Sequence, residues 1–254
     1  MAANITEISP TMVDDNTTII VINGFLSETN INVKEWVNTL PKHNKQSKIC
    51  HLDWEASNIS KVLYKIGRNR LAFFAMTSWI PGIGWVNIAK TGFDMNSIVR
   101  QWKTSLDKTI EAGIALANQI DKEDGNYIIL GHSLGARVIY HALTNVKRID
   151  RVKSVCLLGG AVSVDEQWSN ILDRNEHLQM FNLFSKKDWV LKFLYKAGTE
   201  SSNNPVGSSA IKDNRVRNLN VSKMVSSHMK YKESHIGEYL LNHDFGYIPP
   251  DIAS

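Results

Sequence analysis

The sequence of 254 residues has few of the features that mark specialised classes of protein. It contains only two cysteines, Cys50 and Cys156, each in an apolar run typical of a strand, so we predict buried thiols rather than a disulfide. The pattern of cysteines and histidines contains no zinc motif, and no metal site is expected. The formal net charge is only +4, without a long run of lysine and arginine. This charge pattern does not indicate a basic surface that binds nucleic acid, but it allows weak attraction to anionic membranes.

The amino-terminal residues also lack a targeting signal. The stretch MAANITEISPTMVDDN is polar and acidic and has no apolar core of the kind found in a secretory signal peptide. A cytoplasmic location is therefore expected, with leaderless export and peripheral membrane association as the alternatives. The length and the 43% hydrophobic content suit one globular domain, residues 1–254, with a substantial core.

One long stretch carries no charge. Residues 71–89, LAFFAMTSWIPGIGWVNIA, are long enough to span a bilayer, but Pro81, Gly82 and Gly84 interrupt them. Three interpretations are open: a membrane-spanning helix, a buried helix pair, or a lid or interfacial element within an insertion at about 55–95. The third predicts peripheral membrane contact through residues 71–89.

Apolar runs alternate with segments of helical periodicity along the chain. Such alternation implies right-handed crossovers and a mostly parallel sheet with helices on both faces, which is an α/β class of fold. Within 95–120, six residues recur at helical spacing and predict the buried face of a helix: Ile98, Trp102, Leu106, Ile110, Ile114 and Ala117. The expected strands are 17–23, 47–54, 127–130, 152–158, 178–184 and 217–221. The expected helices are 32–40, 95–120, 134–146, 165–173, 189–197 and 228–241.

The sequence GHSLG at 131–135 follows an apolar strand and precedes a helix. A serine on such a turn has strained backbone angles, and side chains two residues away would collide, so Gly131 and Gly135 remove them. The helix that begins after Ser133 directs its positive end at the site, which favours an oxyanion. We therefore predict Ser133 as a nucleophile. The alternative is a glycine-rich turn whose serine caps the helix.

A nucleophilic serine needs a base to accept its proton and an acid to orient that base. In this kind of fold the two follow later strands, in the order serine, acid, histidine. Asp188 comes after the strand at 178–184 and opens a helix, so we predict it as the acid. Its alternative role is a helix cap, and Asp165, after the preceding strand, is the rival acid.

Three late histidines are candidates for the base. His228 follows the last expected strand by seven residues and begins the last helix, from which it can reach back over the sheet. We therefore predict His228 as the base, and we interpret His235 and His243 as surface or packing residues. His132 is adjacent to the serine and points the wrong way to accept its proton.

A tetrahedral intermediate also needs N–H donors for its oxyanion. The backbone N–H of Leu134 is one candidate. The second is expected in the loop after the first strand, where INGFLSE places Gly24 and Phe25 and makes the Phe25 N–H the candidate. No metal or organic cofactor is expected, because side chains alone activate the nucleophile.

Three segments together resemble one known family: YIILGHSLGARVIYHAL, FSKKDWVLKFLYKA and VSSHMKY. It is the uncharacterised α/β-hydrolase family typified by the transmembrane and coiled-coil domain-containing proteins, and INGFLSE is similar to its glycine turn. The resemblance runs from about Thr17 to Tyr239 and implies an α/β-hydrolase fold with Ser133, Asp188 and His228 as a triad. The long helical and transmembrane extensions of the larger family members are not in this sequence. The resemblance therefore implies the hydrolase core of the family but not its membrane anchoring.

The leading functional hypothesis is a serine hydrolase that cleaves carboxylic esters. A lipid or phospholipid substrate is favoured because Phe73, Phe74, Trp79 and Trp85 lie in the charge-free segment and could form an apolar acyl site or lid. One alternative is a soluble esterase or thioesterase acting on a small acyl substrate. The other is a hydrolase-like scaffold that binds without turnover.

Overall fold

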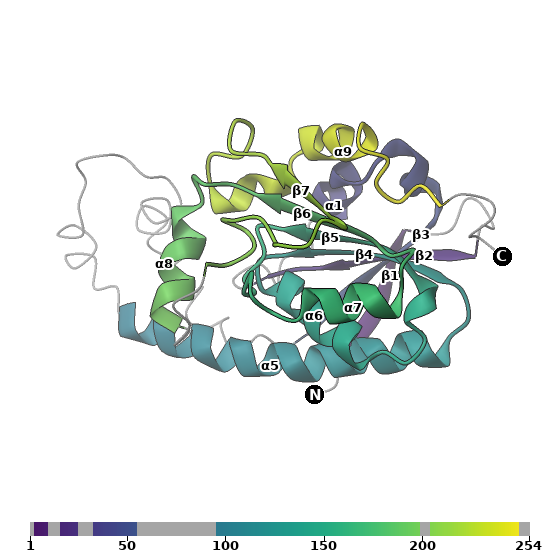
Figure 1. The fold of residues 1–254 in the computed structure, drawn as a ribbon, viewed down its shortest axis with the longest axis horizontal. Helices are drawn as coiled ribbons and strands as arrows, with labels where there is room; N and C mark the ends of the chain where they lie inside the picture. The colour runs from purple at the N-terminus through teal and green to yellow at the C-terminus, as the bar shows by residue number, and fades with distance from the viewer. Residues whose placement is uncertain (1–2, 10–15, 25–32, 55–94, 199–203, 249–254) are drawn as a thin grey trace.

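The computed structural model describes residues 3–9, 16–24, 33–54, 95–198 and 204–248 (Figure 1). The predicted insertion at 55–95, apart from its last residue, lies outside the described residues, and so do the charge-free segment 71–89 and Phe25. In the part of the chain that is described, no helix has both the length and the apolar character needed to cross a membrane.

The centre of the molecule is a seven-stranded sheet with the order β1-β3-β2-β4-β5-β6-β7. All neighbouring strands from β3 to β7 pair in parallel, whereas β1 runs antiparallel against β3 at the edge. The strands are β1 (Asn4–Ser9), β2 (Thr17–Ile22), β3 (Lys48–Asp53), β4 (Asn126–His132), β5 (Val152–Leu158), β6 (Gln179–Phe184) and β7 (Val216–Asn220).

Helices cover both faces of this sheet (Figure 1). One apolar core joins the sheet to α5, α6, α7 and α8, and a second joins its other face to α1, η3 and α9. A parallel sheet buried on both faces needs such cover, and the runs of isoleucine, valine and leucine in β2, β4 and β5 supply both cores. The helices are α1 (Val33–Thr39), α5 (Met95–Lys122), α6 (Leu134–Asn145), α7 (Trp168–Arg174), α8 (Trp189–Gly198) and α9 (Ser234–Leu241), with 3₁₀ helices η1 (Lys42–Gln46), η2 (Ile149–Arg151) and η3 (His228–Lys232).

This architecture is the α/β-hydrolase fold expected from the sequence. The six expected strands are all present, with bounds shifted by a few residues at most, and both cysteines are free and buried as predicted. The edge strand β1 has no counterpart in the sequence-based expectation. Its sequence, NITEIS, is polar and largely exposed, so it contains no apolar run that would have marked it as a strand.

The buried face of α5 differs from the predicted one. Trp102 and Ala117 are buried as expected, but Ile110 and Ile114 are each 41% exposed. The close contact with α6 is made at Gly113 instead, where there is no room for a side chain: a Cβ on Gly113 would lie 2.4 Å from the Cβ of His141. The hydrophobic spacing therefore predicts the burial of Trp102 and Ala117 correctly, whereas Ile110 and Ile114 are wrongly assigned to the core.

The last predicted helix is also wrong as a single element. Residues 228–241 form η3 and then α9, separated by Glu233 in an extended conformation with φ −88° and ψ 153°. Within η3, His228, Tyr231 and Lys232 are buried, and α9 separately packs on α1.

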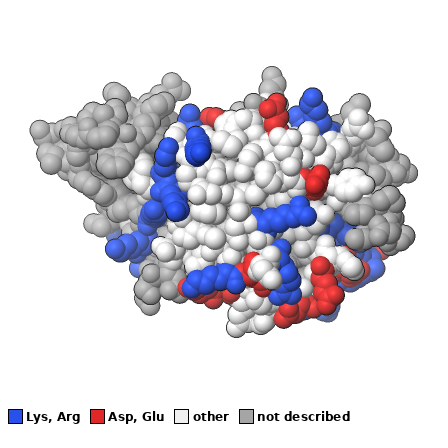
Figure 2. Space-filling model, turned by 45° about the horizontal axis from the view of Figure 1, so that its top comes forward, with Lys and Arg blue, Asp and Glu red and all other residues white. Residues whose placement is uncertain are grey.

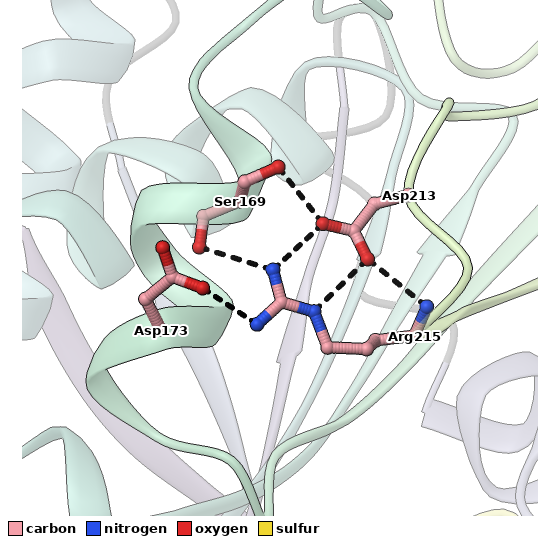
Figure 3. A network of polar contacts seen from close by, with 4 residues as sticks. All are labelled: Ser169, Asp173, Asp213 and Arg215. Carbon is pink, nitrogen blue, oxygen red and sulfur yellow. Dashed lines mark hydrogen bonds and ion pairs between the residues drawn. The ribbon is translucent and has the colours of Figure 1, made fainter.

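A cluster of polar side chains holds the segment that precedes β7 against α7 (Figure 3). The Arg215 guanidinium donates to Asp213 Oδ2 at 2.8 Å and to Asp173 Oδ1 at 2.6 Å. The hydroxyl of Ser169 donates to the same Asp213 carboxylate at 2.8 Å. These contacts join α7 to the segment before β7, and the hydrogen bonds from Arg215 hold the pKa of Asp213 well below its usual value. The start of the strand that leads toward His228 is thereby anchored.

Candidate active site

Ser133 lies on a strained turn at the carboxyl end of β4. Its backbone has φ 57° and ψ −117°, a region that residues with a side chain rarely occupy. The end of β5 holds the turn in place: the Ser133 N–H donates to the Leu158 carbonyl at 3.0 Å, and the Ser133 carbonyl accepts from the Ala161 N–H at 2.9 Å. The turn therefore presents its serine at the edge of the sheet where the parallel strands end.

Three glycines allow neighbouring backbone to pack against this turn. A Cβ on Gly131 would lie 2.6 Å from the carbonyl of Gly135, and a Cβ on Gly135 would lie 2.4 Å from the carbonyl oxygen of Ile22. A Cβ on Gly24, in the loop after β2, would lie 2.4 Å from the Cβ of Ser133. Such separations exclude any side chain at these three positions. The loop after β2 is thus in direct contact with the serine.

The Ser133 hydroxyl is buried and makes no hydrogen bond within the described part of the chain. α6 begins at the next residue, so the N–H of Leu134 belongs to the first turn of a helix, where amide groups have no partner within the helix. The positive end of this helix lies beside the hydroxyl. A negative charge that develops on an oxygen here would be stabilised by that N–H and by the helix.

Asp188 is fully buried and holds two groups with its two oxygens. Its Oδ1 accepts the N–H of Leu191 at 3.0 Å, in the first turn of α8. Its Oδ2 lies 2.6 Å from Nδ1 of His228. Asp188 is therefore both a helix cap and the partner of a histidine, and the two roles that seemed to be alternatives in the sequence coexist.

The imidazole of His228 is oriented by this contact. Because a carboxylate accepts hydrogen bonds, Nδ1 carries the proton and Nε2 is the basic nitrogen of the neutral ring. The segment before His228 is tied to the end of β6, where the Ser185 hydroxyl donates to the Val225 carbonyl at 2.8 Å. Both loops that carry the pair are thus fastened to one another.

His132 links His228 to the turn that carries Ser133. Its Nε2 donates to the backbone carbonyl of His228 at 2.9 Å, and the two rings lie 4.7 Å apart. Burial lowers the pKa of His132 well below its ordinary value, and the nearby His228 and Lys232 lower it further. His132 is therefore neutral, and its ring packs against that of His228 immediately beside Ser133.

The rival residues have other partners. Asp165 is partly exposed, and its carboxylate lies 4.0 Å from Nζ of Lys212. His235 lies 3.5 Å from a carboxylate oxygen of Glu233. His243 lies just after α9, and its Nδ1 donates to the carbonyl of Tyr239 in that helix at 2.8 Å. Of the candidate acids and histidines, the structure brings Asp188 and His228 together.

A second buried polar group, which the sequence did not indicate, lies beside the site. Asn23 precedes Gly24 in the INGFLSE segment, and its side-chain oxygen is contacted by Lys232 from η3. The only signal was its place next to the glycine turn. No signal in the sequence marked Lys232 as buried, because a lysine in a polar segment is normally exposed.

One face of the molecule carries charges of both signs. Figure 2 shows lysine and arginine side chains dispersed over a largely uncharged face, with some acidic side chains between them. Among the described residues, no three histidine, cysteine, aspartate or glutamate side chains gather in a way that could hold a metal ion.

Comparison with known proteins assigns the chain to a family. The profile of the family described as "Protein of unknown function (DUF726)" matches residues 76–243, which is well over half of the chain. The chain belongs to the DUF726 family. This membership agrees with the resemblance drawn from the three sequence segments, and the DUF726 match includes Ser133, Asp188 and His228.

Curated relatives of this DUF726 chain are much longer proteins. "Probable lipase MIL1" of Saccharomyces cerevisiae is 29% identical over 169 residues, which is 63% of this chain and 15% of the relative. "Uncharacterized membrane protein F35D11.3" of Caenorhabditis elegans is 29% identical over 144 residues, or 52% of this chain and 23% of the relative. The chain thus matches less than a quarter of the length of either protein.

Solved structures similar to the DUF726 chain have low sequence identity. Alpha/beta hydrolase domain-containing protein 10 from mouse is 13% identical, with a TM-score of 0.42 and coverage of 95% of this chain and 92% of that one. The Pyrococcus furiosus esterase Pf2001 is 12% identical, with a TM-score of 0.40 and coverage of 94% and 93%. These likenesses are weak, and the fold assignment rests on the strand order and the covering helices.

Proposed function

We propose that this chain is a serine hydrolase that cleaves carboxylic esters through an acyl-enzyme. Ser133 is the nucleophile, His228 the general base and Asp188 the acid that orients it. The observation that carries the proposal is the 2.6 Å contact between His228 Nδ1 and Asp188 Oδ2, made by a histidine that is packed beside the strained turn of Ser133. Such a group has the order and the parts of a serine–histidine–acid triad.

In the first half of the reaction, Ser133 Oγ attacks the carbonyl carbon of the ester while His228 Nε2 takes the hydroxyl proton. The carbonyl oxygen becomes an oxyanion, which the Leu134 N–H and the start of α6 stabilise. The N–H of Phe25 remains the second donor predicted from the sequence. Collapse of the intermediate breaks the bond to the alcohol oxygen, and His228 returns its proton to that leaving oxygen.

In the second half, water attacks the acyl carbon of the Ser133 ester. His228 Nε2 accepts a proton from the water, and the same oxyanion donors act again. The bond to Ser133 Oγ then breaks, the proton returns to Oγ, and the carboxylic acid leaves. Throughout, Asp188 stabilises the imidazolium form of His228 without itself taking the proton.

We favour a lipid or phospholipid as the substrate over a small soluble ester. Support for this choice comes from the yeast relative, whose name is that of a probable lipase and which shares 169 aligned residues with this chain. A small-molecule esterase or thioesterase would use the same triad. The two differ in the length of acyl chain that they prefer and in their response to a lipid surface.

A chain-length series tests the proposal. The purified protein is assayed with p-nitrophenyl esters of short, medium and long acyl chains, in buffer and with mixed detergent micelles, and then with phospholipid vesicles. A lipase-type enzyme prefers the long chains and gains activity when micelles or vesicles are present. Preference for the shortest ester without such a gain would favour the small-molecule esterase, and no turnover of any ester would contradict the hydrolase proposal.

A further inference from the structure

A buried polar group holds the loop that lies against Ser133. The side-chain oxygen of Asn23 accepts the indole N–H of Trp36 at 2.9 Å, and its amide nitrogen donates to Nε2 of His51 at 3.1 Å. The backbone carbonyl of Asn23 accepts the indole N–H of Trp54 at 3.0 Å. Asn23 is thus fixed through both its side chain and its backbone by residues that follow it along the chain.

Lys232 completes this group from a distant part of the chain. Its Nζ lies 3.4 Å from Oδ1 of Asn23 and 3.3 Å from a carboxylate oxygen of Glu35. The same Nζ lies over the ring of Trp36, 5.3 Å from the ring centroid. Only 6% of Lys232 is exposed. Burial lowers the pKa of the Lys232 amine, and the Glu35 carboxylate opposes that shift.

A buried lysine is costly unless its charge has a use. Desolvating an ammonium group disfavours the folded state, and an apolar side chain of similar length would fill the same space without that cost. Glu35 is itself half-exposed, so the ion pair between them is not a strong reason to bury the lysine. The contacts with Asn23 and with the ring of Trp36 distinguish this lysine from one at the surface, and both place its charge against the segment before Gly24.

The position of Asn23 decides the position of Gly24. The space between Gly24 and Ser133 is too small for one methyl group, because a Cβ on Gly24 would lie 2.5 Å from the His132 carbonyl and 2.4 Å from the Ser133 Cβ. A small displacement of the loop therefore moves it against or away from the nucleophile. Catalysis is sensitive to misplacements of this size.

Lys232 also shares a short element with the base. η3 begins at His228 and ends at Lys232, so a single 3₁₀ helix carries the residue paired with Asp188 and the residue that contacts Asn23. A shift of η3 would change both contacts together. The element thereby couples the base to the loop after β2.

We infer that Lys232 is a positioning residue for the proposed hydrolase: through Asn23 it fixes the Gly24 turn against Ser133 in register with His228. The inference rests on the proposed function, since it concerns the same site. It assigns to Lys232 no contact with the substrate. Loss of the Lys232 side chain therefore slows the chemical step and leaves substrate binding largely unchanged.

The test compares Lys232→Met, Lys232→Arg and Lys230→Met with wild type and Ser133→Ala on p-nitrophenyl butyrate. Lys232→Met removes the charge and the hydrogen bonds, and we expect kcat to fall roughly 10- to 100-fold with KM nearly unchanged. Lys232→Arg keeps a cationic donor and should restore most of the loss. Lys230 is on the same η3 and its side chain is 48% exposed, so Lys230→Met should behave as wild type.

The outcomes separate the inference from the proposed function. Wild type that neither hydrolyses the ester nor reacts with a fluorophosphonate contradicts the proposed function, and the inference falls with it. Turnover by wild type together with an unchanged kcat in folded Lys232→Met contradicts the inference alone. A loss in Lys232→Met that Lys232→Arg does not relieve also contradicts it.

Thermal melting reports whether each variant folds. Where Lys232→Met does not fold, Glu35→Gln decides, because Glu35 is half-exposed and its replacement should keep the fold. We expect Glu35→Gln to lower kcat several-fold in the same direction, since Lys232 then loses its ionic partner. A wild-type kcat in Glu35→Gln, with Lys232→Met unfolded, would mean that the lysine serves only stability.

Discussion

Nδ1 of His228 lies 2.6 Å from Oδ2 of Asp188, while Oδ1 of the same carboxylate accepts the Leu191 N–H at 3.0 Å. One buried side chain therefore orients the proposed base and caps α8. In the proposed hydrolase, the helix cap and the orientation of the base thus use different oxygens of this group, so suitable substitutions can separate stability from activity.

Asp188→Asn should remove activity while preserving the fold. The amide oxygen can still accept the Leu191 N–H, but the amide N–H faces Nδ1 of His228 and favours the tautomer with its proton on Nε2. We expect kcat for a short ester to fall on the order of 10⁴-fold, with little change in melting temperature. His228→Ala should lose as much, and His235→Ala, which is remote from Asp188, serves as the control. Near-wild-type turnover by Asp188→Asn would exclude Asp188 as the acid.

Gly24→Ala should damage the site more than the fold. The added methyl would meet the Ser133 Cβ and the His132 carbonyl, neither of which can move freely, so the loop must shift. Turnover should fall about 100-fold, with a loss of roughly 1–3 kcal/mol in the free energy of unfolding. Gly113→Ala is a matched control, since its methyl would meet His141 equally closely at the α5–α6 contact, away from the serine. It should lose similar stability and keep its kcat; equal losses of kcat in both variants would contradict this account.

The orientation of α5 can be tested by denaturation. Trp102 is buried, so Trp102→Ala should cost about 3–5 kcal/mol of unfolding free energy. Ile110→Ser and Ile114→Ser, at positions 41% exposed, should each change it by no more than about 0.5 kcal/mol. Urea titrations of the three variants measure these differences. A large cost for either isoleucine would mean that its side chain is buried, as the hydrophobic periodicity predicts.

The stability of the domain should fall as the pH is lowered below neutrality. Burial, and to a lesser extent Arg137, lowers the pKa of His141 from 6.5 to about 4. Between these two values the unfolded chain binds more protons than the folded one, so stability is lost as the pH falls through this window. His141→Gln removes one titrating group, and its loss of stability between pH 8 and pH 5 should be smaller than that of wild type. Equal losses, measured by urea denaturation at both pH values, would contradict this role of His141.

Much of the fold could be predicted because its strands are buried on both faces. Continuous runs such as TTIIVI and VKSVCLL are visible without knowledge of their neighbours. β1 could not be found in this way, because an exposed edge strand needs few apolar residues and is defined by its pairing with β3. Likewise, the contact face of α5 depends on how closely α6 approaches it, and that distance is a tertiary property.

The candidate site likewise combines residues that a local pattern predicts with contacts that only the folded chain creates. Ser133 and its glycines could be predicted because the turn's backbone requires those residue types locally. Asp188 and His228 were placed by their order after successive strands, whereas the contact that joins them depends on the folded loops. The role we infer for Lys232 depends on a contact with Asn23, 209 positions away in the chain, and no local pattern encodes that contact.

The central claim is that Ser133 is an activated nucleophile, and covalent labelling tests it most directly. The wild-type protein is treated with a fluorophosphonate, digested, and examined by mass spectrometry, with Ser133→Ala and His228→Ala treated in parallel. The account predicts one modified peptide, with the phosphonyl group on Ser133, no labelling of Ser133→Ala, and much slower labelling of His228→Ala. Labelling at another residue, or an unlabelled Ser133 in protein that turns over esters, would contradict it.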